Sequence, residues 1–248
     1  MSNDITLYTF SISHFSEKIR WTLDFAHVPY REVRWTPFLH IAPALLKSRR
    51  ATTVPIIEVG ETVIQDSTRI LHWLERNRAP FALIPEDRVV RDQVMEAEAM
   101  FDRIGSHVIR YAYATAFSQP DSILRLWTLD ASQWQKRLLK MSFPMVTVMA
   151  KKAFNLSPDA VDRSEGLIED AVRWLEDQVS ESGYIVGDQL TAADITAAAL
   201  LAPLACPDEH PVYCRDDYRD GMEPLRQKWR DSAGFEWVRE IYRKHRRV

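Results

Sequence analysis

A proline inside a strand pattern constrains the fold of the first eighty residues more than any other feature. Residues 53–57 read Thr-Val-Pro-Ile-Ile, a short apolar run typical of a buried strand. Because proline has no N–H to give to a sheet ladder, it belongs at a strand start, an edge or a bulge, often in a tight turn with a cis bond. We therefore predict a strand over 54–59 whose edge backbone is left free near Pro55.

A helix start follows at short range. Residues 61–65 form another strand pattern, and Asp66-Ser67 then precede a segment with Ile70, Leu71 and Leu74 on one helical face. Helix N-termini attract carboxylates, because unpaired N–H groups and the positive end of the helix dipole converge there. A free strand edge beside such a helix start favours a short peptide that carries a carboxylate as the ligand.

The first eighty residues alternate between strand and helix periods. The predicted elements are a strand over 5–10, a helix from Phe15, a strand over 31–35, a short helix over 37–49, strands over 54–59 and 62–65, and a helix over 67–77. The order is βαβ, α, ββα. The crossover helix implies a parallel pair of early strands, and the turn at Gly60-Glu61 implies an antiparallel pair.

The rest of the chain is predicted to be helical. A proline-bracketed linker at 79–85 separates the two parts, so we expect domains over 1–79 and 86–248. The predicted helices span 88–118, about 121–154, 158–181, 191–206, 221–231 and 234–246. The fold class is thus an α+β domain followed by an all-helical one.

Composition narrows the function classes. The 248 residues carry a formal net charge of −3 and no dominant basic block, which argues against a nucleic-acid partner. No apolar run approaches the roughly 18 residues of a membrane span, and no signal peptide is expected. The two cysteines, Cys206 and Cys214, fit a reducing compartment such as the cytoplasm. With His210 they give only three candidate zinc ligands, so we expect no metal.

Three motifs in order resemble those of the cytosolic glutathione transferase family: Val54-Pro55, Asp66-Ser67 and Gly187–Asp194. The resemblance covers nearly the whole chain and implies a thioredoxin-like N-terminal domain, a homodimer and a role in detoxification. It implies glutathione as co-substrate. Val54, before a cis proline, would bond the cysteinyl backbone, and Asp66-Ser67 would hold the γ-glutamyl end. Gly187–Asp194 would be the helix-capping motif of the helical domain.

The resemblance places the catalytic residue where the first strand gives way to the first helix. Ser13 matches the serine or cysteine of several family classes, and we expect its O–H to stabilise the glutathione thiolate. Two alternatives stay open: Ser13 is only a helix cap, or Ser11 or Ser16 is the true contact. Because no cysteine precedes residue 206, a disulfide-exchange mechanism at this site is disfavoured.

Further site residues are predicted more loosely. Arg50 or His40 is expected to meet the glycyl carboxylate, which needs a cation or a donor. Charged residues of the first helix (Glu17, Lys18 and Arg20) are interpreted as a solvated face. The electrophile pocket is expected to be lined by Ser11, His14, Phe101, His107 and Tyr111.

Some alternatives remain at this stage. Met141, Met145 and Met149 are interpreted as an adaptable apolar surface, which would be substrate pocket, dimer contact or plain core. The expected activity is conjugation of glutathione to a small hydrophobic electrophile. The alternatives are a non-catalytic binding module of the same fold and a glutathione-dependent lyase, isomerase or peroxidase.

Overall fold

The computed structural model describes residues 4–48, 52–78, 81–179 and 181–246. The chain divides into two compact units. The first comprises Met1–Phe81 and Leu124–Val148, and the second comprises Ala82–Ile123 and Met149–Val248. The first unit therefore takes in a helical segment from the middle of the chain, besides the N-terminal residues expected to form a domain.

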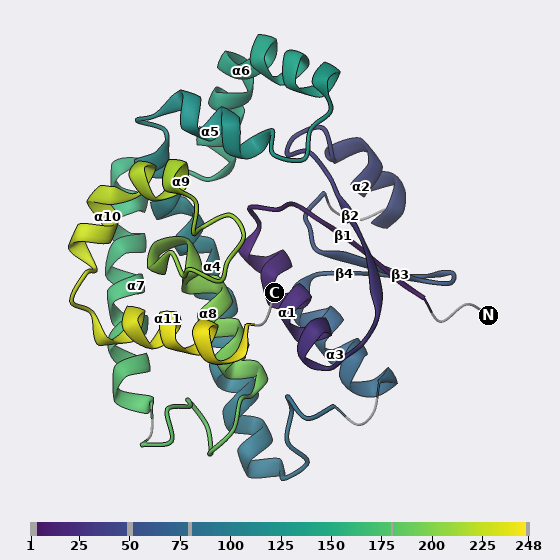
Figure 1. The fold of residues 1–248 in the computed structure, drawn as a ribbon, viewed down its shortest axis with the longest axis vertical. Helices are drawn as coiled ribbons and strands as arrows, with labels where there is room; N and C mark the ends of the chain where they lie inside the picture. Colours follow the sequence, from purple (N-terminus) through teal and green to yellow (C-terminus); the bar gives the residue numbers. More distant parts are fainter. Residues whose placement is uncertain (1–3, 49–51, 79–80, 180, 247–248) are drawn as a thin grey trace. The chain divides into compact units, whose positions relative to one another are not determined.

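The first unit contains a four-stranded mixed sheet (Figure 1). Its strands are β1 (Ile5–Thr9), β2 (Tyr30–Arg34), β3 (Ile56–Val59) and β4 (Thr62–Gln65), in the order β2-β1-β3-β4. β1 runs parallel to β2, while β3 is antiparallel to both β1 and β4. The predicted parallel pair and the predicted hairpin are both confirmed.

Three helices accompany the sheet: α1 (His14–Phe25), α2 (Ile41–Ser48) and α3 (Ser67–Asn77). α1 and α3 pack together. Side chains alternate across a strand, so Leu7 and Ile57, which are paired and fully buried, point to one face and Tyr8 points to the other. Tyr8 packs with Ala44 of α2 and Ile56, so α2 covers the second face.

The backbone turns into the left-handed conformation directly after α1. His27 follows the helix with φ 52°, a conformation in which glycine is common and histidine is tolerated. Its backbone N–H donates to Asp24 O at 3.1 Å.

The remaining elements are helical, as predicted. They are α4 (Arg88–Ala116), α5 (Pro120–Trp127), α6 (Gln133–Ala153), α7 (Pro158–Gln178), α8 (Ala192–Ala205), α9 (Asp216–Gly221), α10 (Glu223–Lys228) and α11 (Ala233–His245). The single helix expected over 121–154 is in fact two, α5 and α6. Ser132 N–H donates to the Gln135 side chain at 2.8 Å and so begins a new helix, whereas Pro144 lies within α6 without ending it.

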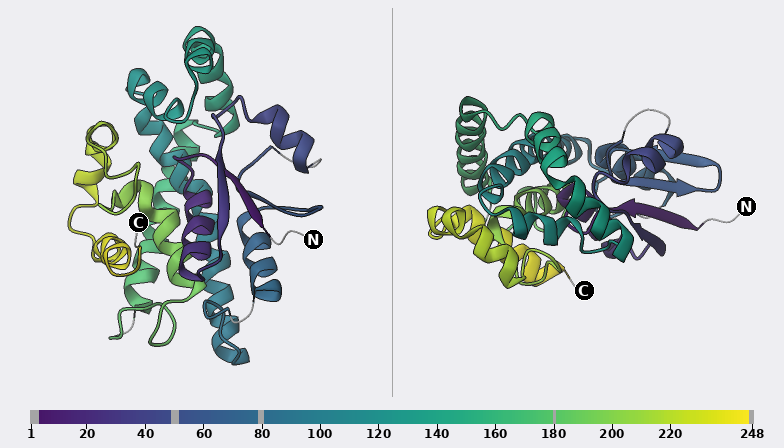
Figure 2. Two further views of the ribbon diagram at one scale, coloured as in Figure 1. Left: turned by 45° about the vertical axis from the view of Figure 1, so that its right-hand side comes forward. Right: turned by 90° about the horizontal axis from the view of Figure 1, so that it is seen from above.

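Helix α8 forms the centre of the second unit, with α4 and α11 packed against it (Figures 1 and 2). Every residue of α8 is buried, which explains why its sequence is apolar on all sides. Such a helix must satisfy the polar groups of both ends inside the protein. Among the described residues, no helix has the length and apolarity needed to cross a membrane.

A buried carboxylate satisfies the start of α8. Asp194 accepts hydrogen bonds from Thr191 N (2.8 Å) and Thr191 Oγ1 (2.9 Å), which fits the predicted capping motif. Its second oxygen accepts from Ile185 N at 2.8 Å and ties the preceding loop to the helix. Asp194 is fully buried, so these three donors stand in for the water it has lost.

We predict that Asp194→Ala lowers the free energy of unfolding by about 3 kcal/mol, because three buried donors lose their acceptor. Urea unfolding followed by circular dichroism would measure the change. Asp188→Ala is the matched control, since Asp188 lies exposed in the same segment and should change stability by less than about 0.5 kcal/mol. Equal effects of the two substitutions would contradict this role for Asp194.

Candidate functional site

Ser13 lies where the sequence predicted a catalytic serine. It is the N-cap of α1, and its Oγ accepts a hydrogen bond from Ser16 N at 3.1 Å. The predicted cap is therefore present. A hydroxyl that accepts one hydrogen bond can still donate another, and no acceptor for the Ser13 O–H is found among the described residues. The cap and a contact to a ligand sulfur are compatible.

The neighbouring serines differ from Ser13. Ser16 is fully buried, and its Oγ has no hydrogen-bond partner among the described residues. Ser11 is half-buried in the loop that precedes the helix. His14 is buried with its ring against Phe15, the centroids being 4.5 Å apart. Ser13 thus combines a half-buried position with an uncommitted O–H group.

The proline motif adjoins the acidic-serine motif. The Val54–Pro55 peptide bond is cis, as the resemblance implied. Asp66 N–H donates to Pro55 O at 3.3 Å, so the residue that opens α3 is bonded to the residue that opens β3. The Gln65 side chain also donates to Thr53 O at 2.7 Å. Two motifs that are separated by ten intervening residues are therefore joined by main-chain contact.

Asp66 and Ser67 begin α3 in different environments. Asp66 is exposed, is the N-cap, and has φ 89°, while its Oδ1 accepts from Arg69 N at 3.0 Å. Ser67 is buried, and its Oγ accepts from Lys18 Nζ at 3.4 Å. Thr68 Oγ1 accepts from the same ammonium at 3.4 Å. A buried cation therefore adds to the positive end of the α3 dipole.

Lys18 and Arg20 were missed by the sequence reasoning. Glu17, Lys18 and Arg20 were interpreted as a solvated face, and this is wrong, because all three are buried. Their partners are supplied by β2 and α3, which helical periodicity within α1 does not reveal. The one available signal was the presence of three charged residues within the four positions 17–20, around the apolar Ile19.

Arg20 ties the end of β1 to its surroundings. Its guanidinium donates to Phe10 O at 2.6 Å, to Glu32 Oε1 at 2.6 Å and to Glu17 Oε2 at 3.0 Å. Burial alone would raise the pKa of Glu32, but Arg20, Thr9 and Arg34 together outweigh burial and hold that pKa below its ordinary value, with Arg20 making the largest of these contributions. Because Phe10 immediately precedes the loop to Ser13, this network fixes the point from which the serine loop departs.

Two residues are predicted for the glycyl carboxylate. Arg50 lies outside the described residues. The role of His40 stays a prediction, and its surroundings are the following. Burial lowers its pKa to about 4, so the ring is neutral at physiological pH. Its Nε2 lies 2.8 Å from Thr52 O and must carry the proton to donate there, which leaves Nδ1 as an acceptor.

The three pocket residues expected on α4 contact α7. Tyr111 OH donates to Glu165 Oε1 at 2.5 Å, and His107 Nδ1 lies 3.0 Å from Ser164 Oγ. Phe101 is fully buried, with its ring 5.9 Å from that of Trp174. Phe101, His107 and Tyr111 thus each contact a residue of α7, and their assignment to an electrophile pocket stays a prediction.

The methionines of α6 are on the surface. Met141, Met145 and Met149 are 83%, 62% and 51% exposed, which excludes the plain-core interpretation. They continue a stripe of exposed apolar residues that begins with Trp134 and Leu138 on the same helix. The pocket and dimer-contact interpretations of this stripe stay predictions.

No metal cluster accompanies these sites. Among the described residues, no three His, Cys, Asp or Glu side chains gather closely enough to hold a metal ion. His210 has a structural role, because its Nδ1 accepts from Val212 N and Tyr213 N, each at 3.1 Å. Cys206 and Cys214 are free thiols.

Comparison with known families decides the identity of the fold. The family model of the glutathione S-transferase N-terminal domain matches residues 7–81, and that of the C-terminal domain matches residues 158–243. The chain belongs to the glutathione S-transferase family. The family fold, thioredoxin-like sheet included, supports a glutathione-binding function of this type. No curated protein matches the sequence.

Solved structures with the same fold are distant in sequence. A glutathione S-transferase from Methylobacillus flagellatus KT with GSH bound is 14% identical, with 94% of this chain and 98% of that chain covered and a TM-score of 0.59. One from Methylobacterium radiotolerans, in complex with glutathione sulfonate, is 16% identical, with 94% and 93% covered and a TM-score of 0.60. The beta-etherase LigF from Sphingobium sp. strain SYK-6 is 19% identical, with 95% and 98% covered and a TM-score of 0.62.

We predict that Arg20→Met lowers the free energy of unfolding of this transferase-family chain by about 3 kcal/mol. The reason is that Glu17 and Glu32 would stay partly buried without their main counter-charge. Arg34→Met is the matched control: Arg34 pairs with the same Glu32 at 2.9 Å, but its side chain is 52% exposed, so less than about 1 kcal/mol is expected.

The pH dependence of stability gives this prediction a second readout. Glu32 has a lowered pKa in the folded state, so its contribution to stability is present above the ordinary pKa of 4.5 and is lost as the pH falls through the lowered value. Arg20→Met should flatten this acid limb. A variant as stable as the parent, with the same acid limb, would refute the positioning role of Arg20.

Proposed function

We propose that this chain is a glutathione transferase that joins the sulfur of glutathione to a small hydrophobic electrophile. The observation that carries the proposal is the arrangement within the first unit. A half-buried serine with an uncommitted O–H caps α1, and the cis Val54–Pro55 turn is bonded to the start of α3. Family membership supports the same conclusion.

The proposed glutathione site has one recognition element for each part of the tripeptide. The γ-glutamyl end carries an ammonium and a carboxylate. The exposed carboxylate of Asp66 suits the ammonium, while the start of α3, reinforced by buried Lys18, suits the carboxylate. The main chain of Val54 is proposed to bond the cysteinyl backbone. Arg50 stays our proposal for the glycyl carboxylate.

Ser13 is proposed to act on the sulfur by hydrogen bonding. A free thiol with a pKa of about 8.5 is only about 3% thiolate at pH 7. A hydrogen bond to the charged form contributes roughly 1.5–3 kcal/mol, which lowers the pKa by about one to two units. The thiolate fraction then rises to roughly a quarter to three-quarters. The positive N-terminal end of α1 acts in the same direction.

The reaction needs no redox partner. The thiol proton leaves to solvent, and the sulfur lone pair forms a bond to an electrophilic carbon. In a substitution the leaving group departs with the electron pair of the broken bond. In an addition the carbon framework takes up a proton instead. Ser11 and His14, which flank Ser13, are our proposed neighbours of the acceptor.

Two further features are proposed on the strength of the family. We infer that the chain works as a homodimer and that it resides in the cytoplasm, where its free thiols, Cys206 and Cys214, stay reduced. The proposed biological role is detoxification of small electrophiles.

We predict that Ser13→Ala raises the thiol pKa of bound glutathione by about one to two units, because the hydrogen bond to the thiolate is lost. Turnover at neutral pH should fall about tenfold or more. The pKa would be read from the ultraviolet absorbance of the thiolate as a function of pH in the presence of saturating glutathione. Ser13→Thr keeps a hydroxyl and should restore most of the effect.

Ser232→Ala is the matched control, because Ser232 caps α11 in the way that Ser13 caps α1. It should cost about 1 kcal/mol of stability and leave the thiol pKa unchanged. If Ser13→Ala changes only stability, Ser13 is a cap alone. If the parent binds no glutathione by calorimetry, the chain is a non-catalytic module.

A panel of acceptors separates the remaining activities. Halides, epoxides, hydroperoxides and ethers would be offered with glutathione to the parent and to Ser13→Ala. Conjugation of halides or epoxides is expected. Turnover confined to hydroperoxides would instead assign a peroxidase, and turnover confined to ethers would assign an ether-cleaving activity of the kind named for the Sphingobium structure.

The dimer proposal predicts a solution mass of twice 28.8 kDa at micromolar concentration. Light scattering after size-exclusion chromatography would measure it, and a mass near 28.8 kDa across the accessible concentration range would contradict it.

A further inference from the structure

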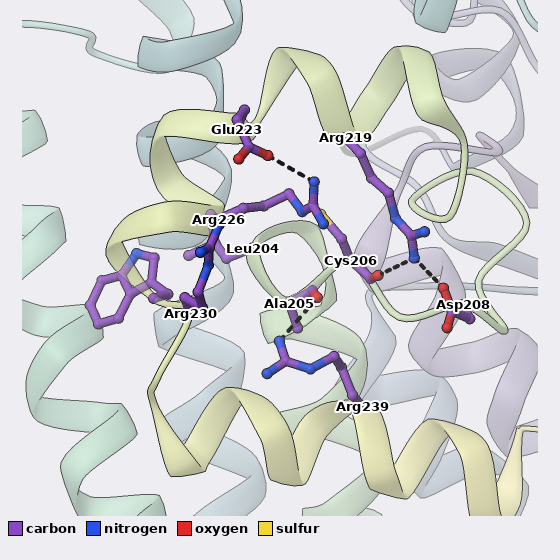
Figure 3. A pocket seen from close by; sticks show the side chains of 10 residues that line it. Leu204, Ala205, Cys206, Asp208, Arg219, Glu223, Arg226, Arg230 and Arg239 are labelled. Carbon is purple, nitrogen blue, oxygen red and sulfur yellow. Dashed lines mark hydrogen bonds and ion pairs between the residues drawn. The ribbon is translucent and has the colours of Figure 1, made fainter.

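The second unit contains a polar cavity that includes none of the residues proposed for the glutathione site. It has a volume of about 320 Å³ and lies at the C-terminal end of α8 (Figure 3). Four arginines from different segments converge on it: Arg219 of α9, Arg226 of α10, Arg230 just beyond α10, and Arg239 of α11. All of them lie within one compact unit.

Two of these arginines satisfy the end of the buried helix α8. Arg219 donates to Cys206 O at 2.8 Å and pairs with Asp208. Arg239 lies 3.5 Å from Ala205 O and pairs with Glu236 at 2.9 Å. Because the last carbonyls of α8 are buried and the helix dipole is negative there, this contact with cations has a structural explanation.

The other two arginines are not needed to satisfy the carbonyls at the end of α8. Arg226 pairs with Glu223 at 2.8 Å, and among the described residues it donates no hydrogen bond to an α8 carbonyl. Arg230 is exposed, and its guanidinium has no hydrogen bond or ion pair within the described part of the chain. The four guanidinium groups thus face three carboxylates, and the unmatched positive charge is that of Arg230.

The thiol in the cavity wall adds no charge. Burial raises the pKa of the Cys206 thiol to about 12 despite the nearby arginines, so the thiol stays neutral and supplies no negative charge. Within the described residues, the positive charge of the four arginines is therefore opposed only by the three carboxylates.

We propose that this cavity binds a small oxyanion with two or more negative charges, of the phosphate or polycarboxylate class. Guanidinium groups are suited to both, because their planar N–H pairs match the oxygens of phosphate and carboxylate. The volume is at the lower end of the range of ligand pockets, which fits a small molecule. The lining is polar, so an apolar guest has little to gain there.

The site is separate from the proposed glutathione site. Its residues come from α8 to α11 in the second unit, whereas Ser13, Val54 and Asp66 belong to the first unit. The proposal therefore does not depend on the proposed function, and the two can fail independently.

The test is titration of the full chain with inorganic phosphate and, in a separate arm, with citrate, at constant ionic strength set with chloride. Isothermal titration calorimetry would give the affinity, and the rise of the melting temperature with ligand concentration would give a second estimate. Saturable binding of at least one probe is expected, and the tighter of the two distinguishes phosphate from carboxylate as the recognised group.

Arg230→Gln should weaken that binding about tenfold or more, because it removes the unmatched cation among the four arginines. The affinity of Arg230→Lys should lie between those of Arg230→Gln and the parent, because it keeps the charge but loses the planar guanidinium. Arg163→Gln is the matched control: Arg163 is an exposed arginine of α7 in the same unit and does not line the cavity. It makes the same change in net charge and should alter binding by less than about twofold.

Glutathione affinity should be the same in the parent and in Arg230→Gln. The proposal is overturned if neither phosphate nor citrate binds saturably, or if Arg230→Gln and Arg163→Gln weaken binding equally. The second result would mean that the anions respond only to net charge.

Discussion

The buried guanidinium of Arg20 is the interaction on which the serine site depends. It is 5% exposed and joins three places: the carbonyl at the end of β1, a carboxylate on β2 and a carboxylate on its own helix. An ion pair of this kind gains little net free energy over an apolar packing, because the charges must give up their water. Its effect is geometric, since it fixes where the chain leaves β1 and hence where Ser13 begins α1.

Buried polar contacts also fix the second part of the proposed site, at the start of α3. The contact between Asp66 N and Pro55 O holds the start of α3 against the start of β3, and Lys18 reaches from α1 to the hydroxyls of the first turn of α3. These contacts hold the N-termini of α1 and α3 beside the same sheet. In the proposed complex, the thiol of the peptide lies at the positive N-terminal end of α1, and a carboxylate lies at that of α3.

Much of the fold was predictable, because its signals are local. The bounds of α3 and β4 and the cis proline of the β3 motif followed from short-range patterns. The charged residues of α1 were misread because their partners, Glu32 and Ser67, lie far along the chain, and a helical period carries no information about them. Similarly, the period of α4 could not show that Tyr111 faces α7, and the pKa of His40 depends on a burial that only tertiary structure reveals.

The arginine cavity illustrates a further limit. Arg219, Arg226, Arg230 and Arg239 are spread over 21 positions among other charged residues, and no motif marks them. Only the arrangement of α9, α10 and α11 around the end of α8 brings them together (Figure 3). Two of these arginines, Arg219 and Arg239, contact the buried carbonyls at the end of α8. The same cluster therefore has a structural role as well as the proposed binding role.

A crystal structure of the wild-type chain with glutathione would test the central claim most directly. The account predicts that the sulfur lies within hydrogen-bond reach of Ser13 Oγ, that the cysteinyl backbone runs along Val54, and that the γ-glutamyl group sits at the start of α3. Glutathione bound elsewhere, or with its sulfur turned away from Ser13 towards another residue, would contradict it.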